Sequence, residues 1–129
     1  MDWTYALGSL AEYEIVAGAN GDWPVSSGDP LLALRTAVTR RTVTDEVVGS
    51  DQRIEIEDAL RLYGPDAAYL GFAEEEKGTL EPGKLADVTM LSADPRATAP
   101  EELTDIDVEY TIVGGEVRYD RERGDHPSS

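Results

Sequence analysis

Several residue types are absent or scarce in this 129-residue sequence. It contains no cysteine, which excludes disulfide bonds and thiolate metal sites. Its one histidine, His126, lies near the C-terminus and is expected to be solvated. No apolar run approaches the roughly 20 residues that a membrane-spanning helix needs, so we expect no membrane partner. The first residues carry no positively charged stretch that would begin a signal peptide, and we therefore expect a cytoplasmic protein.

Basic residues are also scarce. Eleven lysines and arginines face 27 acids, which gives a formal net charge of −16. Nucleic acid is excluded as a partner, because a phosphate backbone would be repelled. Lys77 and Lys84 are the only lysines. A diffuse acidic surface with few lysines suits a cytosol at molar salt, where the Debye length is about 3 Å and self-repulsion is screened. The composition therefore predicts a halophilic protein, against the alternative of an ordinary acidic one.

The remaining composition, with 40% hydrophobic and 29% charged residues, is typical of a soluble globular domain. Apolar residues at helical spacing predict a helix over residues 5–11, and a short apolar run predicts a buried strand over 13–18. Residues 20–24 are dense in turn formers. Asp29 is a good N-cap and is followed by a proline, so a helix is predicted over residues 30–41.

The second half of the sequence changes from helical to strand-like periodicity. Its predicted elements, in order, are a loop over 42–53, helices over 57–63 and 66–72, a strand over 88–91 and a helical turn over 100–103. The pair Gly114-Gly115 separates two β-rich runs, residues 108–113 and 116–119. Because both glycines can take positive φ, this pattern predicts a β-hairpin.

Three segments resemble motifs of the metal-dependent amidohydrolase superfamily. Residues 78–87, GTLEPGKLAD, are similar to a G-x-L-x-x-G-K-x-A-D segment, and residues 111–119, TIVGGEVRY, are similar to a closing T-x-V-x-G-x-x-V-Y hairpin. Residues 21–25, GDWPV, resemble the G-S-D-W-P-V segment of the YtcJ-like branch, although Asn20-Gly21 replace the usual serine. The resemblance extends from about residue 5 to residue 119 in the expected order.

The resemblance implies an α/β fold that is a C-terminal fragment of a (β/α)8 barrel, with its last strand and helices, joined to part of a small composite β-sandwich. The implied parts are the barrel end over residues 1–73, the sandwich portion with its hairpin over 74–120, and a disordered tail over 121–129. Within this scheme Asp87 is expected to be a structural carboxylate that accepts hydrogen bonds from nearby backbone N–H groups.

Asp22 is the one matched active-site residue. The resemblance places it at the end of the eighth barrel strand. There it would bind a divalent metal, for which zinc is the first expectation, and take a proton from metal-bound water. The implied reaction is hydrolysis of carbon–nitrogen bonds other than peptide bonds. From the residues alone, Asp22 is better explained as a turn residue before Trp23-Pro24.

The histidines of such a metal site are missing from this sequence. One carboxylate cannot provide the three protein ligands of a catalytic zinc, so we expect the chain alone to bind no metal tightly and to be inactive. Three interpretations remain open: a fragment of an amidohydrolase, one half of a split enzyme whose partner chain supplies the missing barrel half, or a non-catalytic binding or assembly module.

The truncation itself predicts uncovered apolar surface. In isolation, residues Ile15, Val16, Leu31, Leu34 and Val38 are expected to be exposed, because in a barrel they would pack against neighbouring units. We therefore expect self-association, most simply a homodimer, or binding of the missing barrel half.

Overall fold

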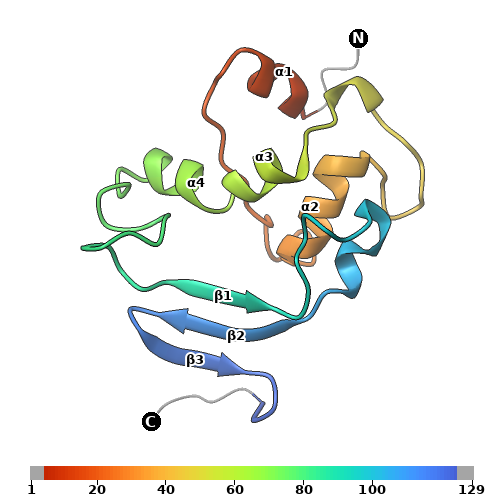
Figure 1. The fold of residues 1–129 in the computed structure, drawn as a ribbon. Helices are drawn as coiled ribbons and strands as arrows, with labels where there is room; N and C mark the ends of the chain where they lie inside the picture. The colour runs from red at the N-terminus through yellow and green to blue at the C-terminus, as the bar shows by residue number, and fades with distance from the viewer. Residues whose placement is uncertain (1–4, 125–129) are drawn as a thin grey trace.

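The computed structural model describes residues 5–124 as a group of short helices followed by a small sheet (Figure 1). The α-helices are α1 (Leu7–Glu12), α2 (Pro30–Thr39), α3 (Ile56–Arg61) and α4 (Pro65–Leu70). The 3₁₀ helix η1 (Ser50–Gln52) lies between α2 and α3. A second 3₁₀ helix, η2 (Pro100–Asp105), separates the strand β1 (Val88–Leu91) from the strands β2 (Val108–Val113) and β3 (Glu116–Asp120). None of the helices in residues 5–124 is long and apolar enough to cross a membrane.

Helix α2 begins as its sequence predicts. The backbone N–H of Leu31 donates to Oδ1 of Asp29 at 2.9 Å, which makes Asp29 the N-cap, and Pro30 is the first helical residue. The helix ends two residues before the predicted boundary, because Arg40 takes a left-handed conformation with φ of 58°. That turn directs its buried guanidinium group to the carbonyl oxygens of Val48 and Gly49.

The hydrophobic core lies where η2 folds back onto α2 and α3. Leu103 of η2 is 1% exposed and packs with Leu31 and Leu34 of α2 and with Leu62. The expectation that Leu31, Leu34 and Val38 would be exposed is therefore wrong: both leucines are buried and Val38 packs against the core. The sequence pattern missed this because η2 lies about 60 residues further along the chain, and periodicity carries no information on such distant contacts.

The three strands form one antiparallel sheet in the order β1-β2-β3. Val88 pairs with Ile112, and Val113 pairs with Glu116 across the hairpin turn. Gly114 and Gly115 have φ of 59° and 84°, as the hairpin prediction required. The predicted strand over residues 88–91 and the predicted hairpin are thus confirmed. Within the described residues the sheet is a single layer, which is at most part of the expected sandwich.

The segment of residues 13–18 differs from its prediction. It forms no strand but an irregular connection between α1 and α2, and Ile15 and Val16 are 54% and 41% exposed. Its backbone contacts are local or isolated, with Ile15 N–H donating to Leu10 O at 2.9 Å and Ala19 N–H to Leu62 O at 3.1 Å. A strand needs a neighbour to pair with, and among residues 5–124 no segment forms a ladder with residues 13–18.

Candidate functional site

Asp22 lies in a tight turn between α1 and α2. Its backbone φ is 48°, its N–H donates to Oδ1 of Asn20 at 2.8 Å, and its carbonyl oxygen accepts from the N–H of Val25 at 2.8 Å. The residue is exposed, and its carboxylate has no hydrogen bond or ion pair among the described residues. The turn therefore occupies the backbone of Asp22 and leaves its side chain available. Since residues 13–18 form no strand, Asp22 does not follow a strand end as expected.

Gly21 explains why this turn departs from the family pattern. A Cβ atom at Gly21 would lie 2.7 Å from the Cα of Gly28, so no larger residue fits without a shift of the backbone. The hydroxyl group of Ser26 donates to the carbonyl oxygen of Gly21 and closes the same turn. A serine at position 21 is incompatible with this close approach. The contact with Gly28, which sequence reasoning missed, could have been suspected only from the high density of glycine in this region.

The described residues do not form a metal site. Nowhere in residues 5–124 do three or more histidine, cysteine, aspartate or glutamate side chains come together in a way that could hold an ion. His126 lies outside the described residues. A catalytic zinc takes three protein ligands and keeps one open position, so Asp22 alone does not fit such a metal.

The segment of residues 78–87 has the structural role expected of it. Gly78 and Gly83 have φ of 99° and 98°, values that side-chain-bearing residues rarely adopt. Lys84 Nζ lies 2.8 Å from Thr79 Oγ1, and so holds the loop together from within. Oδ1 of Asp87 accepts a hydrogen bond of 2.7 Å from the N–H of Gly114, which ties the loop to the hairpin turn. The prediction that Asp87 is a structural carboxylate is confirmed.

A cavity of about 510 Å³ lies between this loop, α4 and the strands β1 and β2. Tyr63 lines it, and its buried hydroxyl group has no hydrogen-bond partner among residues 5–124. Burial, with a smaller contribution from the negative charge of Asp29, raises the pKa of Tyr63 above its usual value. The neutral phenol is therefore the form that the fold favours.

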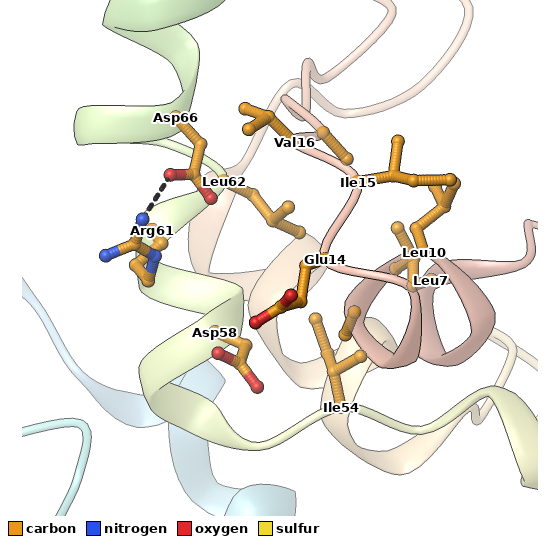
Figure 2. Close-up of a pocket in the computed structure, with 12 residues that line it drawn as sticks. Leu7, Leu10, Glu14, Ile15, Val16, Ile54, Asp58, Arg61, Leu62 and Asp66 are labelled. Carbon is orange, nitrogen blue, oxygen red and sulfur yellow. Dashed lines mark hydrogen bonds and ion pairs between the residues drawn. The ribbon is translucent and has the colours of Figure 1, made fainter.

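A second pocket, of about 350 Å³, lies between α1, the segment after it, α3 and the start of α4 (Figure 2). Leu7, Leu10, Ile15 and Leu62 supply much of its apolar lining. Asp22 does not line it, so this pocket is separate from the candidate catalytic residue.

Comparison with known proteins gives the same family for nearly the whole chain. A model of the amidohydrolase family matches residues 1–119. The chain is 27% identical to the putative amidohydrolase YtcJ of Bacillus subtilis over 94% of its own length and 23% of that protein. It is 29% identical to the N-substituted formamide deformylase of Arthrobacter pascens, over 91% of this chain and 22% of the enzyme.

A plant protein is also similar. The chain is 33% identical to the protein LONG AFTER FAR-RED 3 of Arabidopsis thaliana over 90% of this chain and 20% of that protein. No solved structure gives a significant match. The chain thus spans about a fifth of the length of the curated relatives that it matches. Since the family model covers residues 1–119 of the 129, the chain belongs to the amidohydrolase family.

Proposed function

We propose that this chain is the C-terminal part of a metal-dependent hydrolase of carbon–nitrogen bonds other than peptide bonds, and that it has no activity by itself. The observation that carries the proposal is the family match over residues 1–119 in a chain that spans only about a fifth of its relatives. One of those relatives is named for the deformylation of N-substituted formamides, which is a reaction of this class.

Asp22 is the residue that the chain would contribute to the catalytic site. Three features support this role: its exposed position, its unpaired carboxylate and a backbone held by Asn20 and Val25. The other metal ligands would come from outside the described residues, because residues 5–124 provide no cluster that fits a metal. Those ligands would belong to barrel segments on the same polypeptide or on a partner chain.

The experiment starts with the chain alone. After addition of zinc and dialysis, we expect no stoichiometric metal by elemental analysis, and no hydrolysis of an N-substituted formamide such as N-benzylformamide. The genomic region that encodes the chain is then sequenced for an upstream or neighbouring reading frame with a His-x-His motif and the missing barrel strands. Co-expression with that polypeptide is expected to yield a complex that binds metal and hydrolyses the formamide or a related amide.

Two substitutions test Asp22 in that complex. Asp22→Asn is expected to lower kcat by at least about 100-fold, because the substitution removes the negative charge of a group at the reacting centre. Asp105→Asn is the matched control: Asp105 is an exposed aspartate of η2, far along the chain from the turn, and activity should be unchanged. Hydrolysis by the isolated chain, or full activity of the Asp22→Asn complex, would contradict the proposal.

A further inference from the structure

The pocket between α1 and α3 is open to solvent and is lined by both apolar and charged side chains. Leu7 and Leu10 of α1 form one side, and Ile54 and Leu62 form the other (Figure 2). Ile15, on the connecting segment, is 54% exposed beside them. Ile54 and Leu62 are buried in the core, so the apolar surface that this cavity of about 350 Å³ leaves open to water belongs to the connecting segment, where Val16 is also 41% exposed. Exposed apolar side chains beside an open cavity are a feature of binding surfaces.

Two carboxylates in this pocket have no cationic partner. Glu14 and Asp58 both line it and point into the same part of it (Figure 2), and neither side chain has a hydrogen bond or ion pair among the described residues. Of the described residues that line the pocket, Arg61 alone is basic, and its Nη2 donates to Oδ1 of Asp66 at 2.7 Å. The pocket therefore combines an apolar lining with an uncompensated negative charge.

The backbone at Glu14 brings its side chain to this position. Glu14 has a φ of 53°, a left-handed conformation that costs a residue with a side chain about 1–2 kcal/mol. Its N–H donates to Ala11 O at 3.1 Å, and the next residue, Ile15, donates to Leu10 O at 2.9 Å. This tight ending of α1 turns the chain so that Glu14 and Ile15 both line the pocket.

We propose that this pocket binds an apolar polypeptide segment that carries an arginine or lysine, whose cation lies between Glu14 and Asp58. Aliphatic neighbours of that cation would contact the leucines and isoleucines of the lining. The proposal rests on the proposed function, because the segment would belong to the part of the hydrolase that this chain does not contain. Such a contact gives both apolar burial and charge complementarity, which favours the correct partner and its correct orientation.

A second copy of this chain suits the pocket less well. Each copy carries a net charge of −16, and a two-fold contact at this pocket would bring the Glu14 and Asp58 carboxylates of both copies together. Like charges placed opposite one another in an interface oppose association. The homodimer expected from the sequence is therefore an outcome that the experiment must distinguish.

The experiment measures peptide binding to the whole chain, without metal or substrate. The ¹⁵N-labelled protein is titrated with the peptide acetyl-Leu-Leu-Arg-Leu-Leu-amide at low salt and followed by amide chemical shifts. The control peptide has citrulline in place of arginine, which keeps the shape and removes the charge. We expect saturable shifts in α1 and α3 with the arginine peptide and at least about 10-fold weaker binding of the citrulline peptide. Affinity should fall from 0.1 M to 1 M salt, where charges are screened beyond about 3 Å.

Three variants locate the charge effect. Glu14→Gln and Asp58→Asn are each expected to weaken binding of the arginine peptide several-fold, and together to remove the difference between the two peptides. Glu12→Gln is the matched control, since Glu12 ends α1 but does not line the pocket. A native-like amide spectrum for each variant verifies that it folds.

Equal affinity for the two peptides, no saturable shifts in α1 and α3, or an unchanged preference in the double variant would overturn the proposal. A stable dimer by sedimentation, weakened by Leu10→Ser, would assign the pocket to a second copy and overturn it as well. Because the titration involves no metal and no hydrolysis, a failure of the proposed function in the reconstituted complex is detected separately.

Discussion

Replacement of Gly78 by alanine tests whether the family segment is packed as the structure shows. Gly78 has φ of 99°, and a Cβ atom added there would lie 2.7 Å from the Cβ of Ala68 and 3.1 Å from the Cα of Pro65. The backbone strain alone costs about 1–3 kcal/mol. Crowding against α4 adds about 1–3 kcal/mol, because both neighbours lie in a helix and cannot move easily. We therefore expect Gly78→Ala to lower the free energy of unfolding in urea by about 2–6 kcal/mol.

Gly83 provides the matched control, because its φ is 98° but a Cβ atom added there would have no neighbour within 4 Å. Gly83→Ala should show the strain without the crowding, so the difference between the two variants measures the contact with α4. Ala68→Gly removes the atom nearest to the added Cβ. It should therefore lower the free energy of unfolding less in the Gly78→Ala variant than in the wild-type chain. Equal destabilisation by the two glycine substitutions, or a full additive cost of Ala68→Gly, would refute this packing.

Three further substitutions test the core, the buried phenol and the loop. Leu103→Ala should lower the free energy of unfolding by about 2–5 kcal/mol in urea, because Leu103 is 1% exposed at the centre of the core. Tyr63→Phe should leave stability unchanged or raise it by about 1 kcal/mol, because it removes a buried hydroxyl group that has no partner. The raised pKa of Tyr63 stabilises the fold below the unfolded value near 10, and this contribution is lost as the pH rises through the folded value. Alkaline unfolding curves of the two proteins should therefore separate above pH 10, with Tyr63→Phe the more resistant. Asp87→Ala should speed amide hydrogen exchange at Gly114, whereas Asp87→Asn, which keeps an oxygen acceptor, should change it less.

Local signals in the sequence predicted most of the helices and strands. The N-cap Asp29, the proline Pro65 that begins α4 and the pair Gly114-Gly115 each act on residues close to them in the chain. Their effects follow from backbone geometry and single hydrogen bonds, and need no knowledge of the rest of the fold. For this reason α2, α4 and the β2–β3 hairpin lie within about two residues of their predicted positions.

Contacts between distant parts of the chain could not be predicted in this way. The burial of Leu31 and Leu34 depends on η2, and the turn at Asp22 depends on the approach of Gly28 to Gly21. The candidate site was predicted from a family motif, which names a residue but not its surroundings. The structure adds that the Asp22 carboxylate stands alone among the described residues.

Our proposal gives one explanation for three features of the structure. These are the missing strand at residues 13–18, the exposed side chains of Ile15 and Val16, and the absence of partners for Asp22 among residues 5–124. A strand with no neighbour gains no ladder hydrogen bonds, so this segment stays irregular until another polypeptide segment pairs with it. In a barrel the strand ends carry the reactive groups, so the same segment that pairs with residues 13–18 would bring its own ligands toward Asp22. We therefore expect the amides of Val16 and Ala17 to exchange rapidly in the isolated chain and slowly in the reconstituted complex. Hydrogen exchange followed by mass spectrometry measures this directly. If the complex binds metal while these amides remain unprotected, strand formation and metal binding are independent. Asp22 would then reach its fellow ligands without strand formation, which would contradict this explanation.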